Sequence, residues 1–190
     1  MVKNMDEKII SKIDETIKSI WENEIADDYK KHWLLKEDTL KNAFYFHLRN
    51  QLSELLNNND IRIFTEFTDD KFWGTNFRPD IVIAEMDFDR HSDYFGDDVK
   101  TCIAVIELKY KNSTVPAKTI LNDYDKLHKY VEKLKLDSKC RLYMATIWER
   151  EDEEAYWEDE NSKWAKNRLT ELNASYKLGT RDMRFYICKH

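Results

Sequence analysis

The sequence predicts an α/β fold in which a mixed β-sheet is flanked by helices. Segments with helical apolar spacing alternate with shorter segments of strand-like pattern. The first strand-like segments follow one another closely, and a helix then leads to a later strand. The 190 residues, of which 42% are apolar, suit one domain with a buried core.

Four segments have the apolar periodicity of helices. Residues 6–26 form an amphipathic pattern that we expect to pack on the domain, with a dimer contact or a membrane surface as the alternatives. A second helix is expected over 35–56, because the polar run 57–60 ends it. Helices are also predicted over 117–136 and 162–172.

The strand-like segments alternate in polarity or form short apolar runs bounded by turns. We predict strands over residues 61–67, 79–84, 101–110, 141–148 and 184–188. The aspartate-rich stretch 87–100 reads as a solvated loop, because it lacks the glycine and the closing glutamate of a calcium loop. The single predicted domain thus has an N-terminal helix (1–30), a core (35–148) and a C-terminal extension (149–190).

The composition predicts a cytoplasmic protein. Its three cysteines, Cys102, Cys140 and Cys188, lie far apart in apolar runs, which favours reduced core thiols. No segment is apolar enough to span a membrane, and the N-terminus lacks the pattern of a signal peptide. The net charge of −6 does not favour nucleic-acid binding, although a local basic cleft matters more than the total charge.

Three charged residues form the strongest candidate site. Glu107 and Lys109 lie two residues apart at the end of an apolar strand and therefore point to the same face. Asp80 opens the preceding strand, after Pro79. Asp/Glu-x-Lys triplets recur in this charged chain, but only this one ends an apolar strand. A buried Glu107–Lys109 ion pair is the structural alternative.

These residue types suit metal-assisted hydrolysis. The carboxylates of Asp80 and Glu107, with the carbonyl of Leu108, offer oxygen ligands to a hard cation such as Mg²⁺. The ion would polarise a phosphodiester and lower the pKa of a bound water molecule. Lys109 would orient that water or stabilise the transition state.

The pattern Pro79-Asp80 … Glu107-Leu108-Lys109 resembles the PD-(D/E)xK nuclease superfamily, which has the restriction-endonuclease-like fold. Residues 35–148 follow the α-β-β-β-α-β order of that family's core. The resemblance implies that Asp80 and Glu107 bind the metal and that Lys109 serves the water. It also implies a catalytic glutamate on the first core helix, and Glu37 matches that position.

Helical geometry places Glu37 on the same face as Phe44 and Leu48, toward the core. An ordinary first-turn acid that favours the helix dipole is the alternative. Many family members carry a polar motif on the helix after the lysine strand, and Lys126 and Tyr130 keep its four-residue spacing. By that resemblance they would contact nucleic acid. The alternative for Lys126 is an ordinary lysine on the exposed face of a helix.

A basic cluster late in the chain offers a second nucleic-acid surface. Trp164, Lys166 and Arg168 are its centre, and a solvated helix face is the alternative reading. Phe72, Trp73 and Phe77 could stack on bases, or cap the core.

Two functions follow from the sequence. One is a Mg²⁺-dependent endonuclease, with Mn²⁺ as a substitute, acting on nucleic acid, expected to be DNA, in defence, repair or a mobile element. The other is a catalytically silent protein of the same fold that binds or regulates a protein partner, as the acidic balance suggests. A homodimer is left open, and no membrane association is expected.

Overall fold

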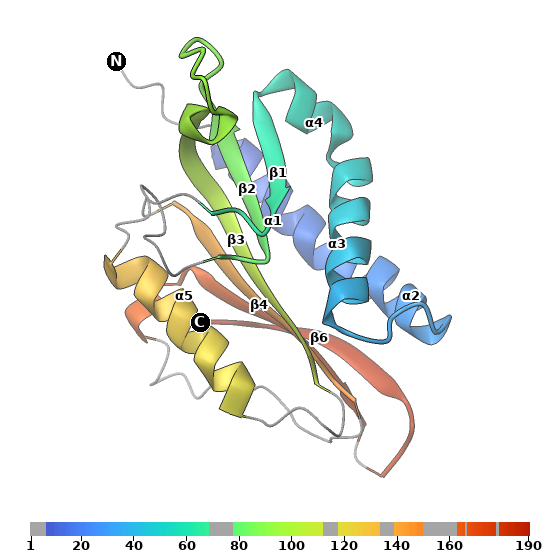
Figure 1. The fold of residues 1–190 in the computed structure, drawn as a ribbon. Helices are drawn as coiled ribbons and strands as arrows, with labels where there is room; N and C mark the ends of the chain where they lie inside the picture. The colour runs from blue at the N-terminus through green and yellow to red at the C-terminus, as the bar shows by residue number, and fades with distance from the viewer. Residues whose placement is uncertain are drawn as a thin grey trace.

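The computed structural model of the chain is an α/β protein with a six-stranded mixed sheet flanked by helices (Figure 1). It describes residues 7–68, 78–111, 118–133, 139–149, 163–165, 167–177 and 179–190. Along the sheet the strands follow chain order, from β1 at one edge to β6 at the other. β3, β4 and β5 are parallel, and the other pairs are antiparallel.

The strands largely match the segments expected from the sequence. They are β1 (Ile61–Thr65), β2 (Ile81–Met86), β3 (Val99–Lys111), β4 (Arg141–Trp148), β5 (Leu169–Tyr176) and β6 (Met183–Lys189). β2 begins two residues after Pro79, which has no N–H to offer to a strand partner. β3 begins at Val99, after a short 3₁₀ turn, η2 (Phe95–Asp98), within the predicted loop.

The predicted helices are present with breaks. The described helical segments are α1 (Glu7–Ile20), the π-helical turn η1 (Trp21–Ile25), α2 (Ala26–Lys30), α3 (Glu37–Gln51), α4 (Ser53–Asn58), α5 (Lys118–Lys133) and the 3₁₀ turn η3 (Lys163–Ala165). The polar run after Leu56 ends α4 as expected, and Asp60 adopts a positive φ of 53° before β1. Asp tolerates this left-handed conformation better than most residues.

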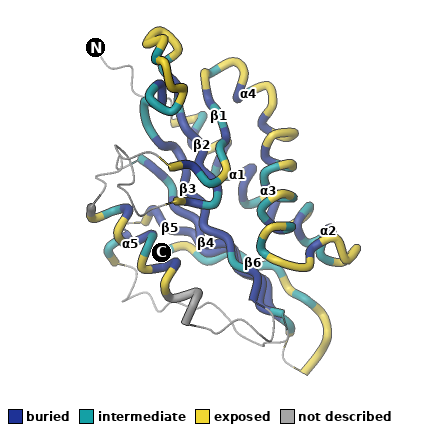
Figure 2. Tube along the Cα trace, viewed as in Figure 1, coloured by how far each residue is buried: buried dark blue, intermediate teal, exposed yellow. Residues whose placement is uncertain are grey.

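Helices cover both faces of the sheet, so the chain has two apolar cores (Figure 2). On one face, α1 and α3 pack Ile17 and Phe44 toward the side chains of Ile106 and other strand residues. On the other face, α5 packs Leu127 toward Val105. The alternation of side chains along β3 assigns Ile106 and Leu108 to the first core and Val105 to the second.

The N-terminal helix packs on the domain, as expected. Trp21 is fully buried between the rings of Phe44 and Phe185. Its indole Nε1 donates a hydrogen bond of 3.1 Å to the backbone oxygen of Asn173 on β5. The apolar stripe of this helix is therefore packed within the chain.

The prediction of a helix over residues 162–172 is wrong, since Leu169–Tyr176 forms the strand β5. All but the last residue of β5 are buried, because β4 and β6 pair with it and helices lie over both faces. Polar and apolar residues alternate from Glu171 to Tyr176, but no continuous apolar run marks the segment as a strand buried on both faces. A buried strand with Glu171 and Asn173 in its core thus resembled a solvated helix.

Two expectations from composition agree with the structure. Cys102, Cys140 and Cys188 are all free thiols, and the first two are buried. Among the helices of the described residues, none is long and apolar enough to cross a membrane.

Candidate functional site

The register of β2 and β3 brings Asp80 next to Glu107. Ile81, the first residue of β2, pairs with Ile106, so the adjacent residue Asp80 lies beside the next residue of β3. Because β3 continues beyond this pair, its end has no β2 partner on that side. The Asp80 carboxylate takes that place, since its Oδ2 accepts a 2.8 Å hydrogen bond from the backbone N–H of Leu108. The Asp80 carboxylate is thereby fixed against the backbone of the Glu-x-Lys triplet.

Glu107 is the most deeply buried acid of the site, with 1% of its surface exposed. The hydroxyl of Tyr130 on α5 donates a 2.7 Å hydrogen bond to its Oε1. The ammonium of Lys126, one turn earlier on α5, lies 3.6 Å from its Oε2. Burial and repulsion from Asp80 nevertheless raise the pKa of Glu107 well above its ordinary value.

Lys109 is held by two carboxylates from opposite sides of the sheet. Its Nζ lies 2.9 Å from Glu37 at the first residue of α3 and 2.9 Å from Asp123 on α5. Burial favours the neutral amine, but the hydrogen bond to Glu37 and the charge of Asp123 outweigh it, so the pKa of Lys109 is raised. Lys109 is therefore a permanent cation near neutral pH.

A second lysine neutralises the Asp80 side of the site. Lys41, one turn after Glu37 on α3, forms an ion pair with Glu66 and lies 3.9 Å from Asp80. Glu66 follows β1 with a positive φ of 54°, and its N–H donates to the backbone oxygen of Asp80. Burial raises the pKa of Asp80, and the hydrogen bond from Leu108 and the charge of Lys41 oppose that shift.

The donor set suits a hard cation that keeps part of its water shell. The Glu107 carboxylate is buried and that of Asp80 is half-buried, and burial raises the pKa of both. Across the described ranges, no group of three or more His, Cys, Asp or Glu side chains has metal-binding geometry. Zinc, which is held by three or four protein ligands, is poorly matched. Mg²⁺ binds through one or two carboxylates and fits better.

The structure brings together four residues that the sequence selected, Glu37, Asp80, Glu107 and Lys109. The alternative reading, an ion pair between Glu107 and Lys109, does not match the contacts of these residues, because Lys109 lies beside Glu37 and Glu107 lies beside Lys126. Leu108 is buried beside Asp80, to which its N–H donates. Glu37 lies in the first turn of α3, and its carboxylate also contacts Lys109 of β3.

The residues predicted to contact nucleic acid are less well placed. Tyr130 is fully buried and its hydroxyl is engaged by Glu107. Arg168 is also buried, and its Nε donates to the backbone oxygen of Ala165, because the expected exposed helix is a turn leading into β5. Trp164 stacks on His128 with ring centres 4.7 Å apart. Among the members of this set that the structure describes, Lys126 is the half-exposed cation that lies beside Glu107.

Some predicted features lie outside the described residues. They are Lys166 and the aromatic residues Phe72, Trp73 and Phe77.

Sequence reasoning missed three residues of the site, Lys41, Glu66 and Asp123. A signal existed for two of them. Lys41 lies four residues after Glu37, and Asp123 lies three residues before Lys126, so each shares a helical face with a selected residue. Glu66 gave no such signal, because its contact depends on the turn after β1.

A second buried acid lies on the same face of the sheet, two strands away. Glu107 pairs with Met144 of β4, which pairs with Glu171 of β5. Glu171 is fully buried and accepts hydrogen bonds from the Tyr124 hydroxyl at 2.6 Å and the Asn173 amide at 2.9 Å. Both acids are thus tied to α5 by a tyrosine.

Comparison of this chain with known protein families, with curated proteins and with solved structures found no significant match.

Proposed function

We propose that this chain is a Mg²⁺-dependent nuclease of the PD-(D/E)xK type that hydrolyses phosphodiester bonds in DNA, with Mn²⁺ as a substitute metal. The observation that supports this most strongly is the hydrogen bond from the Leu108 N–H to Asp80. It fixes the aspartate of one strand against the Glu-x-Lys segment of the next, which supports a metal site shared by Asp80 and Glu107.

Asp80, Glu107 and the carbonyl of Leu108 would hold the ion. When bound, it supplies Lewis-acid polarisation of the phosphate and a lowered pKa for a coordinated water molecule. Glu107 is buried and its pKa is raised, so a cation there replaces a proton as the partner of the carboxylate. The two carboxylates would balance the double positive charge of the ion, and water molecules would complete its coordination.

Lys109 acts as a cation in this proposal and not as a general base, because its two carboxylate partners keep it protonated. A protonated lysine can donate a hydrogen bond to the attacking water and stabilise the charge that develops on the phosphate. Glu37 and Asp123 hold its ammonium from opposite sides, so they are positioning residues. A side chain held at both sides loses little further entropy when the substrate arrives.

Cleavage of labelled single-stranded, duplex and branched DNA, and of RNA, in Mg²⁺ or Mn²⁺ tests the proposal. Wild type should cut at least one substrate, and Asp80→Asn and Lys109→Met should each lose about 100-fold or more of that activity. Asp38→Asn, which changes an exposed acid next to Glu37, is the matched control and should keep full activity. Equal activity of wild type and Asp80→Asn would refute the proposal.

A catalytically silent binding protein is the second candidate. One observation favours it, because Lys126 and Lys41 already supply positive charge to Glu107 and Asp80. Such internal neutralisation would stabilise the fold without any metal. In that case calorimetry should detect no Mg²⁺ binding, and a stable protein partner should co-purify with the chain. Mg²⁺ binding that Glu107→Ala abolishes would exclude this second candidate.

A further inference from the structure

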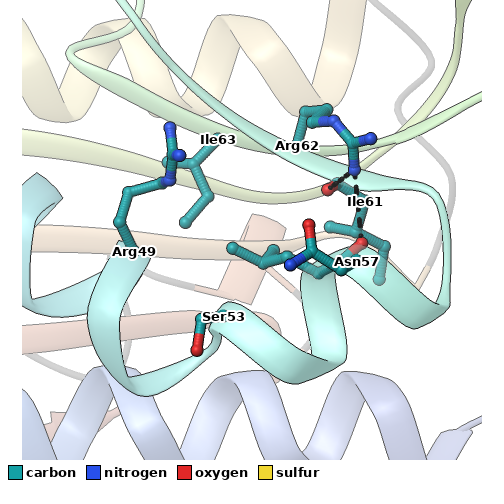
Figure 3. A pocket seen from close by; sticks show the side chains of 7 residues that line it. Arg49, Ser53, Asn57, Ile61, Arg62 and Ile63 are labelled. Carbon is teal, nitrogen blue, oxygen red and sulfur yellow. Dashed lines mark hydrogen bonds between the residues drawn. The ribbon is translucent and has the colours of Figure 1, made fainter.

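A small pocket at the other end of β1 gathers two arginines. Its volume is about 150 Å³, and Arg49 of α3, Ser53 and Asn57 of α4, and Arg62 of β1 supply its polar lining. Figure 3 shows the Arg49 and Arg62 side chains on either side of Ile63. Asn57 and Ser53 also line the pocket. The rest of the lining is aliphatic, and no acidic residue contributes to it.

Arg62 is held in place by contacts that leave its charge uncompensated. Its Nη1 donates to the backbone oxygens of Ile61 at 2.8 Å and Leu56 at 3.3 Å. Its guanidinium also lies over the ring of Phe88, 4.9 Å from the ring centre. These contacts engage one of the terminal nitrogens, so the guanidinium keeps further N–H donors for a ligand.

Arg49 is fixed in a similar way. Its Nη1 donates to the hydroxyl of Tyr45 at 2.9 Å, and the guanidinium lies over that ring. Within the described ranges neither Arg49 nor Arg62 has a carboxylate within ion-pair distance, in a chain where 37 acids outnumber 31 bases. Two like charges beside one pocket, without an acid between them, create a local positive potential that attracts an anion.

We infer that this pocket binds a phosphate group. The planar guanidinium group can donate two parallel N–H bonds to a pair of phosphate oxygens, and hydroxyl and carboxamide groups add neutral donors. A water molecule occupies about 30 Å³ in the liquid, so the pocket has room for a tetrahedral anion with part of its hydration.

The position of the pocket suggests which phosphate it takes, and this step rests on the proposed function. Glu66 of the candidate site lies four positions after Arg62, which corresponds to about 13 Å along an extended chain. One strand of duplex DNA advances about 3.4 Å per nucleotide, so this span corresponds to about four nucleotides. A nucleic acid cut at Asp80 and Glu107 would present a backbone phosphate to Arg49 and Arg62.

Two measurements test the inference, and the first does not depend on nuclease activity. Inorganic phosphate is titrated into the full chain while the arginine Nε–Hε signals are followed by NMR. The signals of Arg49 and Arg62 should shift in wild type. Arg62→Gln should weaken phosphate binding about tenfold or more. Arg181→Gln, at an exposed arginine outside the pocket, is the matched control. Absence of shifts at Arg49 and Arg62 would overturn the inference.

The second measurement identifies the source of the phosphate. Binding of a 20-base-pair duplex is followed in EDTA, which prevents metal-dependent cleavage, over a range of salt concentrations. Arg49→Gln and Arg62→Gln should each weaken binding and together lower the salt dependence by about one phosphate contact. Phosphate binding with unchanged DNA affinity would overturn the nucleic-acid assignment. DNA binding that both substitutions weaken, together with no cleavage of any substrate in the separate Mg²⁺ and Mn²⁺ assay, would overturn the proposed nuclease while leaving the pocket intact.

Discussion

Lys126 Nζ lies 3.6 Å from Oε2 of Glu107, a carboxylate with 1% of its side chain exposed. The same ammonium lies 2.6 Å from Asp123, three residues earlier on α5. The Lys126 ammonium thus lies beside the carboxylate that would bind the proposed metal ion. Its removal should change the affinity of the site for a divalent ion.

Lys126→Gln should therefore increase Mg²⁺ affinity. Two cations beside one buried carboxylate repel each other, and the variant removes the one that belongs to the chain. We expect about a five- to tenfold lower dissociation constant by calorimetry, equivalent to about 1.0–1.4 kcal/mol. Lys129→Gln, on the exposed side of the same helix, is the control and should bind like wild type. Weaker binding by Lys126→Gln would show that this lysine helps to build the site.

The second prediction concerns stability against pH. Since folding raises the pKa of Glu107, the folded state favours protonated Glu107. That contribution to stability is complete below the unfolded value of 4.5 and is lost as the pH rises through the folded value. In metal-free buffer, Glu107→Gln should therefore be more stable than wild type at pH 8, by about 1–3 kcal/mol. The difference should vanish below about pH 4.5.

Urea unfolding across this pH range measures the effect, with Glu54→Gln at an exposed helix position as the control. A Glu107→Gln variant that is less stable than wild type at pH 8 would contradict the prediction. It would mean that Tyr130 and Lys126 compensate the buried charge in full.

Asp123→Asn tests how Lys109 is positioned. The variant removes one of the two carboxylates that hold the ammonium, so the pKa of Lys109 should fall, as followed by the NMR signal of its side-chain Cε. If the nuclease proposal holds, turnover should fall about 10- to 100-fold, because a displaced lysine no longer meets the water correctly. Asp38→Asn should alter neither quantity. An unchanged Lys109 pKa would show that Glu37 holds the ammonium alone.

Trp21→Phe tests the docking of the N-terminal helix. The substitution removes the hydrogen bond to Asn173 and part of a fully buried side chain. We expect a loss of about 1–2 kcal/mol, or roughly 2–8 °C in melting temperature. Trp33→Phe, at a residue that is 69% exposed, should change stability by less than about 0.5 kcal/mol. Equal effects of both substitutions would contradict the observed packing.

The periodicity of apolar residues predicted most of the helices and strands, because the apolar residues of each element pack into a core. The stripe of Phe44 and Leu48 and the apolar run that ends at Glu107 are features of this kind. Residues 169–176 escaped because their burial depends on neighbouring strands far away in sequence. Glu171 and Asn173 are polar residues satisfied inside the protein, a situation that composition alone cannot distinguish from exposure.

The candidate site shows the same limit. Asp80, Glu107 and Lys109 could be selected because strand ends and alternation place them, and Glu37 because helical spacing does. The ion-pair partners of these residues could not be predicted. Lys109 pairs with Glu37 of α3 and with Asp123 of α5, and these two helices lie on opposite faces of the sheet. The lysines that neutralise the carboxylates were ambiguous for the same reason. Lys126 resembles any surface lysine until α5 is placed against the sheet.

The contact between Trp21 and Asn173 has a consequence for synthesis, because 152 residues separate its two partners. Ribosomes add about 5–20 residues per second, so roughly 8–30 s pass between the synthesis of one partner and that of the other. During this interval the isoleucine stripe of α1 lacks the strand that completes its core. The nascent chain is then most exposed to chaperones and to aggregation.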